Sequence, residues 1–187
     1  MSLPLATTLP SPALVVGGTG MLSGTVRALA DDGCTTAVLA RRAASALWAG
    51  PVVPMPVDYT DPAALTDALR RTVRDTGRFR LAVLWVHTPS QAAAYGVIAE
   101  TLTDDALVVE VLGSAAAAPS APPATAPAPF RGHRYRRVVL GFADGGDGTT
   151  RWLSHREISK GVTTAVRTPG DFRIIGRIRP WSDRPGA

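Results

Sequence analysis

The chain has 187 residues, of which 45% are hydrophobic and 19% are charged, a composition typical of one globular domain with a buried core. No apolar run reaches the length that crosses a bilayer, and a single cysteine excludes a disulfide framework and a cysteine-based metal site. The net charge of +5 comes almost entirely from arginine. Because these arginines are spread along the chain and aromatic residues are few, we expect no nucleic-acid surface. We place the protein in the cytoplasm.

The first predicted unit is a strand, a glycine turn and a helix. Residues 14–16 are an apolar run expected to form a strand that is covered on both faces. Gly17, Gly18 and Gly20 allow a tight turn and the close approach of a ligand, and a helix is expected over 21–30. The N-terminus of a helix after such a turn suits a pyrophosphate. A tight turn without a ligand is the alternative.

The rest of the chain alternates apolar strands with amphipathic helices. Further strands are expected at 36–40, 52–57, 81–86, 106–112, 134–142 and 172–178. Helices are expected from Pro62 to Gly77, from Pro89 to about 102 and from His155 to about 166, with N-caps at Asp61 and Thr88 and a capping box at Ser154 and Glu157. Two stretches are expected to be loops, an Ala/Pro-rich one at 115–130 and a glycine-rich one at 144–148.

This alternation predicts a three-layer α/β Rossmann fold. About seven parallel strands are expected, in the order 3-2-1-4-5-6-7, with right-handed crossovers that place helices on both faces. The prolines in the strand at 52–57 indicate a sheet edge. We expect a loose leader at 1–12, without the features of a signal peptide, and a single dinucleotide-binding domain at 13–187.

Two arginines follow the second strand, where the adenosine ribose lies in such a fold. Arg41 and Arg42 occupy this turn, and no acid lies between Gly33 and Trp48. An acid would favour the ribose 2′-hydroxyl of NAD(H), whereas arginine favours the 2′-phosphate of NADP(H). The sequence therefore predicts NADP(H) over NAD(H), with a solvated basic turn as the alternative.

Several stretches resemble the short-chain dehydrogenase/reductase superfamily, and in particular a set of small bacterial proteins of that type. The matching stretches are 16–24, 38–42, 56–62, the strand that ends at His87, and 109–114. The resemblance implies an oxidoreductase whose nicotinamide cofactor is bound by the glycine turn, the basic turn and the ends of the third and fourth strands, at Gly17, Thr19, Gly20, Met21, Leu22, Arg41, Arg42, Asp58, Tyr59 and His87. It also implies a homodimer or homotetramer.

The sequence departs from this family at the active-site motif Tyr-x-x-x-Lys. The residues four positions after Tyr59, Tyr95 and Tyr135 are Ala63, Ala99 and Val139. Another proton donor is therefore expected. Ser114 and His87 stand at strand ends, where α/β sheets bind ligands, and His155 lies in the first turn of the last helix. A structural or solvated role is the alternative for each.

Three further residues, His133, Tyr135 and Trp152, are candidates either for the wall of a substrate pocket or for packing. The three histidines lack the spacing of a metal site, and we predict none.

We therefore expect an NADP(H)-dependent reductase of a small carbonyl, imine or activated double-bond substrate, with a non-standard proton donor. The alternative is a Rossmann module without catalysis, which senses NADP(H) or scaffolds a partner protein. An enzyme that needs no nucleotide is a third hypothesis, which applies if no dinucleotide binds. A small-molecule substrate is the expected partner, and no membrane partner is expected.

Overall fold

The computed structural model describes residues 9–121 and 125–186. Most of the expected leader, residues 1–8, lies outside the described residues, as does part of the Ala/Pro-rich loop, residues 122–124. The described end of the leader contacts the domain, because the Pro12 carbonyl accepts a hydrogen bond from the Arg80 N–H at 2.8 Å. None of the helices in the described ranges combines the length and apolar character needed to cross a bilayer.

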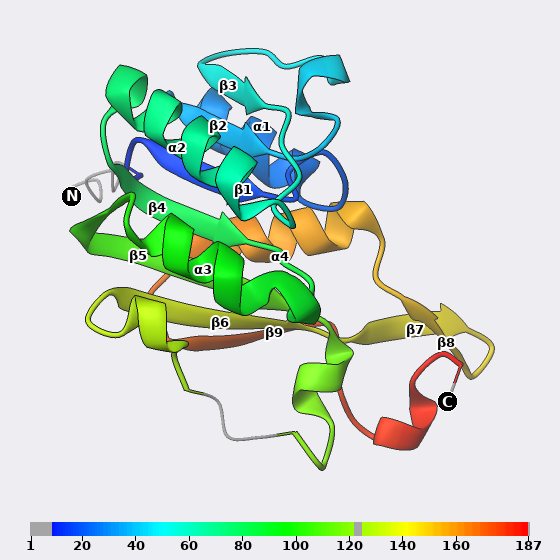
Figure 1. The fold of residues 1–187 in the computed structure, drawn as a ribbon. Coiled ribbons are helices and arrows are strands. Elements are labelled where there is room, and N and C mark those ends of the chain that lie inside the picture. Colours follow the sequence, from blue (N-terminus) through cyan, green and yellow to red (C-terminus); the bar gives the residue numbers. More distant parts are fainter. Residues whose placement is uncertain (1–8, 122–124, 187) are drawn as a thin grey trace, which may run out of the picture.

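A parallel sheet runs through the middle of the molecule (Figure 1). Its seven strands, in spatial order, are β3 (Val52–Met55), β2 (Thr36–Leu39), β1 (Ala13–Val16), β4 (Phe79–Leu84), β5 (Leu102–Leu112), β6 (Arg134–Leu140) and β9 (Phe172–Ile175). This order confirms the predicted one, since β9 is the seventh strand of the sheet. The proline-containing strand β3 lies at an edge, as expected.

Helices cover both faces of the sheet and make the three layers (Figure 1). The helices α1 (Ser23–Asp31) and α4 (His155–Arg167) pack on one face, and α2 (Pro62–Thr76) and α3 (Gln91–Ala99) pack on the other. Strand β1 shows why, because all four of its side chains are buried and successive ones point to opposite faces. Ala13 and Val15 join the core under α1 and α4, and Leu14 and Val16 join the core under α2 and α3.

Two of the three predicted helix caps are confirmed. An Asp61 carboxylate oxygen accepts hydrogen bonds from the N–H groups of Ala63 and Ala64 at 3.1 and 3.0 Å. At α4 the Ser154 hydroxyl accepts from the Glu157 N–H at 3.3 Å, and a Glu157 oxygen accepts from the Ser154 N–H at 2.8 Å. Each cap supplies partners for N–H groups that the first helical turn leaves unpaired.

The third predicted cap, Thr88, is wrong. Residues 88–90 form a 3₁₀ turn, which the Ser90 N–H closes by donating to the His87 carbonyl at 3.0 Å, and α3 begins only at Gln91. The helix also ends at Ala99, earlier than expected, because the chain from Leu102 joins the sheet. There the ladder of β4 and β5 supplies the backbone partners that the helix would have supplied.

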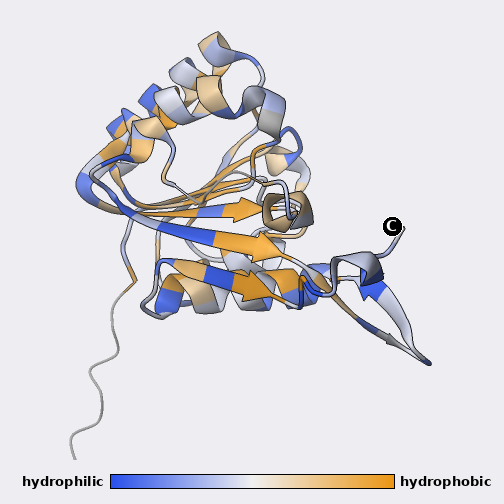
Figure 2. Ribbon diagram, turned by 90° about the horizontal axis from the view of Figure 1, so that it is seen from below, coloured by the Kyte–Doolittle hydropathy of each residue, from blue (hydrophilic) through white to orange (hydrophobic). Residues whose placement is uncertain are grey.

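The sixth predicted strand and the glycine-rich loop are also corrected. The strand stops at Leu140, and the backbone of Arg177 lies so close to the next residue, Gly141, that a Cβ there would collide with it. The chain then forms an antiparallel hairpin of β7 (Phe142–Gly146) and β8 (Thr149–Trp152), with the predicted loop as its tip. The hairpin projects beyond the carboxyl ends of the sheet strands, and it is markedly more polar than they are (Figures 1 and 2).

The connection from β5 to β6 carries no α-helix in its described part. It contains two short 3₁₀ turns, Ser114–Ala117 and Ala128–Phe130. Phe130 is fully buried, and its ring lies 5.0 Å from the ring of Tyr95, centroid to centroid. This aromatic pair therefore belongs to the core on the face of the sheet that α2 and α3 cover.

Candidate functional site

The predicted site residues come to the carboxyl edge of the sheet from several strands. All seven strands are parallel, so the segments that follow them meet at one edge. The chain goes from β1 to β2 on one side, whereas β4 lies on the other side of β1. Open α/β sheets bind ligands in the crevice at such a reversal of strand order.

The glycine turn after β1 presents a row of free backbone donors. Gly17 has φ +80° and its N–H donates to the Leu39 carbonyl at 2.9 Å. The next five N–H groups, in the segment 18–22, donate to no acceptor among the described residues. A Cβ at Gly18 would lie 2.8 Å from Val38 Cγ1, so this position admits only glycine without a shift. Unpaired N–H groups at a helix N-terminus are a suitable binding site for an anion such as a pyrophosphate.

The helix after the turn begins two residues later than expected, at Ser23 rather than at Met21. Gly24 is the reason why α1 and α4 approach closely, because a Cβ there would lie 2.8 Å from Ser159 Cβ. The Ser159 hydroxyl accepts from the Gly24 N–H at 3.1 Å and donates to the Met21 carbonyl at 2.6 Å. Sequence reasoning missed Ser159, since its partners lie more than 130 residues away along the chain.

The basic turn after β2 lies near the end of β3. Arg41 and Arg42 are exposed, and their guanidinium groups make no hydrogen bond or ion pair within the described ranges. Hydrogen bonds from Thr60, and to a smaller extent the charge of Arg41, lower the pKa of Asp58. The Ala40 N–H donates to the Met55 carbonyl at 3.2 Å, which joins the start of the basic turn to the end of β3. The Asp58 carboxylate accepts from the Thr60 N–H at 3.0 Å and from its hydroxyl at 2.8 Å.

A tryptophan that sequence reasoning did not single out lies at the centre of the carboxyl edge. Trp85 follows β4, and its indole extends from Gly17 toward Gly113. A Cβ added at Gly17 would lie 3.2 Å from Cδ1 of the indole, and one added at Gly113 would lie 3.9 Å from Cη2. The His87 ring packs edge-on against this indole, with ring centroids 5.6 Å apart. The backbone N–H of His87 contacts the Tyr59 hydroxyl at 3.5 Å. The only sequence signal was an aromatic residue at the end of an aliphatic run.

The three predicted catalytic residues do not all lie on one surface. Ser114 is half-buried and opens the 3₁₀ turn after β5, next to Gly113 and therefore near Trp85. His87 is exposed, and its ring packs against Trp85. His155 is the exposed first residue of α4 and lines a groove between α1 and α4.

The residues suggested as a pocket wall do not come together. His133 precedes β6 at the amino edge of the sheet, whereas Trp152 lies on the projecting hairpin. Tyr135 is occupied elsewhere, because its hydroxyl donates to the Glu110 carboxylate. The buried Glu110 also accepts from the hydroxyl of the buried Tyr95 at 2.7 Å. This Glu110 cluster, defined as Glu110, Tyr95 and Tyr135, was not predicted.

Burial and the adjacent carboxylate keep both tyrosines of the cluster protonated. Burial is the larger cause, and the Glu110 charge and hydrogen bond add to it, so that the pKa of Tyr95 is raised far above its usual range. Burial and the hydrogen bond to Glu110 raise the pKa of Tyr135 in the same way. The cluster therefore joins α3, β5 and β6 through protonated hydroxyl donors and a shared acceptor.

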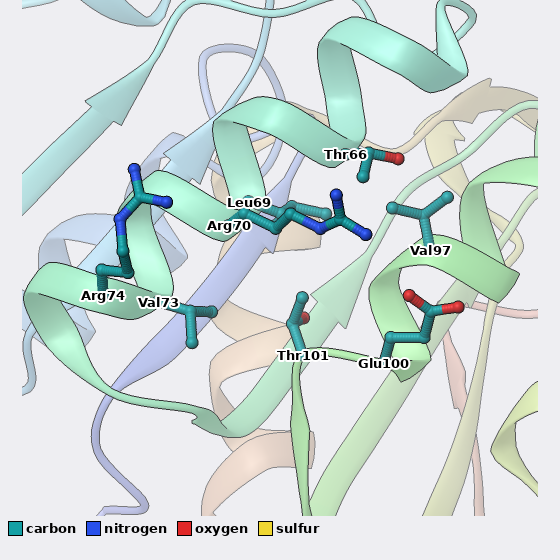
Figure 3. A pocket seen from close by; sticks show the side chains of 8 residues that line it. All are labelled: Thr66, Leu69, Arg70, Val73, Arg74, Val97, Glu100 and Thr101. Atoms are coloured by element: carbon teal, nitrogen blue, oxygen red, sulfur yellow. The ribbon is translucent and has the colours of Figure 1, made fainter.

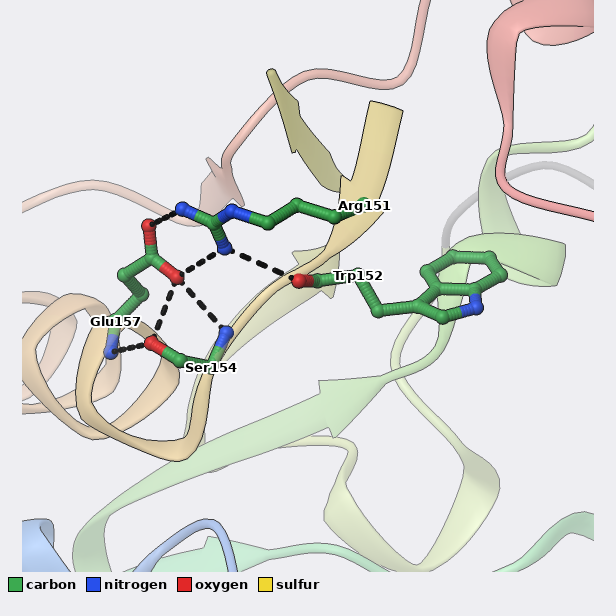
Figure 4. Close-up of polar contacts among 4 residues, drawn as sticks. All are labelled: Arg151, Trp152, Ser154 and Glu157. Carbon is green, nitrogen blue, oxygen red and sulfur yellow. Dashed lines mark hydrogen bonds and ion pairs between the residues drawn. The ribbon is translucent and has the colours of Figure 1, made fainter. Parts of the chain in front are cut away.

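The hairpin is tied to the start of α4 by an ion pair. The Arg151 guanidinium contacts both Glu157 carboxylate oxygens, at 2.8 and 2.9 Å (Figure 4). Hydrogen bonds from Arg151 and then Ser154 hold the pKa of Glu157 well below its usual range. The indole of Trp152, 50% exposed, points away from this ion pair (Figure 4). Trp152 is therefore an exposed aromatic residue on an element that extends past the carboxyl edge.

Two grooves lie on the helical layers. One, of about 250 Å³, runs between α2 and α3 and has Leu69, Val73 and Val97 among its lining residues (Figure 3). Its lining comes from the later turns of both helices, which return the chain toward the amino edge, so it is separate from the predicted site. The other, of about 600 Å³, runs between α1 and α4. Within the described ranges, no three His, Cys, Asp or Glu side chains gather in a way that could hold a metal ion.

Comparison with known proteins finds likeness in structure. No protein-family model matches the chain, and no curated protein matches it in sequence. A short-chain dehydrogenase/reductase from Serratia marcescens is 19% identical, with 88% of this chain and 94% of that chain covered and a TM-score of 0.61. A dehydrogenase/reductase from Sinorhizobium meliloti is 17% identical, with 92% and 94% covered and a TM-score of 0.65.

A third solved structure was determined with a nucleotide. It is a short chain dehydrogenase from Burkholderia cenocepacia in complex with NADP, and it is 15% identical, with 90% of this chain and 97% of that chain covered and a TM-score of 0.66. The likeness extends over nearly the whole length of each protein, and the sheet order agrees with the expected one. This chain has the fold of the short-chain dehydrogenases/reductases.

Proposed function

We propose that this chain is an NADP(H)-dependent oxidoreductase of the short-chain dehydrogenase/reductase type. Its substrate class is a small carbonyl, imine or activated double-bond compound. The observation that carries the proposal is the row of five unpartnered N–H groups at 18–22, close to the free guanidinium groups that follow β2. The structural likeness to a dehydrogenase in complex with NADP supports the same cofactor.

The residues at the carboxyl edge fit the two halves of such a cofactor. The N–H groups of Thr19, Gly20, Met21 and Leu22 would bind the pyrophosphate. On the β2 and β3 side, Arg41 and Arg42 would bind the 2′-phosphate, and Asp58 and Tyr59 would lie beside the adenosine. On the β4 and β5 side, the Trp85 indole would form the floor for the second half, with His87 and Ser114 at its margins.

When bound, the reduced cofactor supplies the hydride. The chain must then hold the substrate and deliver a proton to the atom that gains negative charge. Our proposed donors are the His87 imidazole, which packs against Trp85, and the hydroxyl of Ser114, which follows Gly113 beside the same indole. An imine needs less help from such a donor, since it is protonated near neutral pH more easily than a ketone.

The first prediction concerns cofactor choice. NADPH is expected to bind at least about tenfold more tightly than NADH, and Arg41→Ala/Arg42→Ala should weaken NADPH binding by about 10–100-fold, because charge-assisted contacts to a phosphate are lost. Binding of NADH should hardly change. Calorimetric titration measures all four affinities. Arg70→Ala/Arg71→Ala, which removes two exposed arginines from α2, is the matched control and should leave both affinities unchanged. Equal weakening by the two variants would contradict the assignment.

The second prediction concerns Trp85. If the reduced nicotinamide lies against the indole, excitation of tryptophan should produce emission from bound NADPH, and Trp85→Phe should remove most of that signal. Trp181→Phe is the matched control, since Trp181 lies near the C-terminus against Arg184. Fluorescence titration of the two variants at equal NADPH occupancy makes the comparison. An undiminished signal in Trp85→Phe would place the nicotinamide elsewhere.

A non-catalytic Rossmann module that senses NADP(H) or scaffolds a partner protein is the second candidate function. The absence of Tyr-x-x-x-Lys from the sequence favours it. Cofactor binding without turnover of any aldehyde or imine in a substrate panel would support it.

A homodimeric or homotetrameric state and a cytoplasmic location also remain proposals, and light scattering of the purified protein tests the oligomeric state.

A further inference from the structure

Apart from His155, one of the three predicted catalytic residues, the lining of the groove between α1 and α4 has no part in the proposed oxidoreductase reaction. The groove has a volume of about 600 Å³ and runs from the N-terminal turns of both helices to the end of α4. Its lining residues are Ser23, Gly24, Arg27, Ala28, His155, Arg156, Ser159, Lys160, Thr163, Thr164 and Arg167. No carboxylate is among them, and the His155 imidazole is their one aromatic ring.

Four cationic side chains face this groove. Arg27 comes from α1, and Arg156, Lys160 and Arg167 come from α4. The α4 positions are spaced by four and seven residues, so they lie on one face of the helix and extend along about 16 Å of it. Lys160 is the only lysine of the chain.

These cations have few counter-ions. Arg167 pairs with Asp32 at 2.5 Å, at one end of the groove. Within the described residues, Arg27, Arg156 and Lys160 make no ion pair. Gathering like charges without partners disfavours the folded state. A bound anion would offset that repulsion.

The floor of the groove is fixed by buried hydroxyl groups. The Thr25 hydroxyl donates to the Ser159 carbonyl at 3.2 Å, and the Thr163 hydroxyl contacts the Thr25 hydroxyl at 3.4 Å. With the Ser159 bonds to Gly24 and Met21, these contacts join the two helices at close distance. The cationic side chains therefore project from a rigid floor, and a ligand need not order the helices when it binds.

We propose that the α1–α4 groove is a second binding site, which takes a linear oligophosphate. Guanidinium groups match phosphate oxygens in geometry and charge, and a row of cations suits a chain of phosphates better than a single one. The lining holds no Phe, Tyr, Trp or large aliphatic side chain, so the groove offers no broad apolar surface to a ligand. The chain of phosphates can come from free polyphosphate or from the phosphate tail of a nucleotide.

Calorimetric titration of the full chain with inorganic tripolyphosphate tests this proposal. Wild-type protein is expected to bind it, and Arg156→Gln/Lys160→Gln should weaken binding by about tenfold or more. Arg70→Gln/Arg71→Gln is the matched control on α2 and should bind as wild type does. All four residues are exposed, so both variants should keep the wild-type melting temperature. Binding should weaken steeply as salt is raised.

A parallel titration with adenosine triphosphate distinguishes the two sources. If adenosine triphosphate binds with the same affinity as tripolyphosphate, the groove binds the phosphates alone. If it binds more tightly and Arg156→Gln/Lys160→Gln abolishes this binding, the natural ligand is the phosphate tail of a nucleotide.

The titration is repeated with saturating NADPH to separate this proposal from the proposed function. Unchanged tripolyphosphate binding supports a second site, whereas loss of binding would show that tripolyphosphate only occupies the cofactor site. No binding by wild-type protein at low salt, or equal losses in the two double variants, would also overturn the proposal. If NADPH itself fails to bind, the oxidoreductase proposal falls while the groove is still tested.

Discussion

Glu110→Ala is expected to lower the free energy of unfolding by about 3–5 kcal/mol. Glu110 is 4% exposed in the middle of the sheet and accepts hydrogen bonds from Tyr95 and Tyr135. Alanine would leave both hydroxyl groups without that acceptor and would open a cavity beside α3. Because a domain of this size is stable by only about 5–15 kcal/mol, this is a large share of the total. Urea unfolding followed by circular dichroism measures the loss.

Graded variants keep the result interpretable if Glu110→Ala does not fold. Glu110→Gln preserves an acceptor oxygen and should cost less than alanine does, and Tyr95→Phe removes one hydrogen bond and should cost about 1–2 kcal/mol. Glu100→Ala changes an exposed carboxylate at the end of α3 and should stay within about 0.5 kcal/mol of wild type. A loss for Glu110→Ala no larger than that for Glu100→Ala would show that the cluster contributes little.

The same cluster determines how stability responds to alkaline pH. The pKa of Tyr95 is raised in the folded chain, mainly by burial, whereas an unfolded tyrosine titrates near 10. Above about pH 10 the unfolded chain therefore binds fewer protons, and stability falls as pH rises, by up to about 1.4 kcal/mol per pH unit for this residue. The contribution is fully present below that pH. Urea unfolding at pH 9 to 11 should show a shallower decline in Tyr95→Phe than in wild type.

The features that were predicted correctly depend on residues close together in the sequence. Asp61 accepts hydrogen bonds from N–H groups only two and three residues away. The proline of β3 lacks the N–H that a central strand needs, and β3 accordingly lies at an edge of the sheet. Alternating strands and helices then leave few topologies, because parallel crossovers are right-handed. Local chemistry was therefore enough for the sheet order and for the turn at Gly17.

The features that were missed depend on contacts between distant residues. The backbone of Arg177 lies against Gly141 just beyond the end of β6, and no local pattern reports that approach. Ser159 acts on the start of α1 across a separation of 135 residues. Glu110 resembles an exposed position in an alternating strand until Tyr95 and Tyr135 are seen to converge on it. Each case needs the packed helices and strands before the role of the residue is visible.

The β5–β6 connection joins the fold to the candidate site. Where an α-helix would cross the sheet, the described part of this connection has only 3₁₀ turns, with Phe130 packed on Tyr95 beneath them. Of the three tyrosines, Tyr95 and Tyr135 are held by Glu110, and Tyr59 lies beside the His87 backbone. Neither cluster nor contact involves the side chains of Ser114 and His87, which therefore stay our proposed proton donors.

Ser114→Ala is accordingly expected to lower kcat by about 100-fold or more while the NADPH affinity stays nearly unchanged. The hydroxyl makes no hydrogen bond to another described residue, so its loss should not disturb the fold. His87→Ala should lower kcat by a similar factor if the imidazole supplies the proton. If His155 has its predicted catalytic role, His155→Ala should also lower kcat by a similar factor, although His155 lies in the α1–α4 groove.

The assay follows NADPH oxidation with a panel of small aldehydes and imines, and calorimetry gives the cofactor affinity of each variant. Ser45→Ala, which removes an exposed hydroxyl near the basic turn, is the matched control and should keep wild-type turnover. A fall confined to kcat for Ser114→Ala, with wild-type NADPH binding, assigns the hydroxyl to the chemical step, since uniform binding would instead change KM. Turnover that survives in both Ser114→Ala and His87→Ala would remove them as proton donors. If His155→Ala keeps turnover as well, the proton would have to come from solvent, and an imine that solvent has protonated before the hydride arrives is the substrate that suits this route.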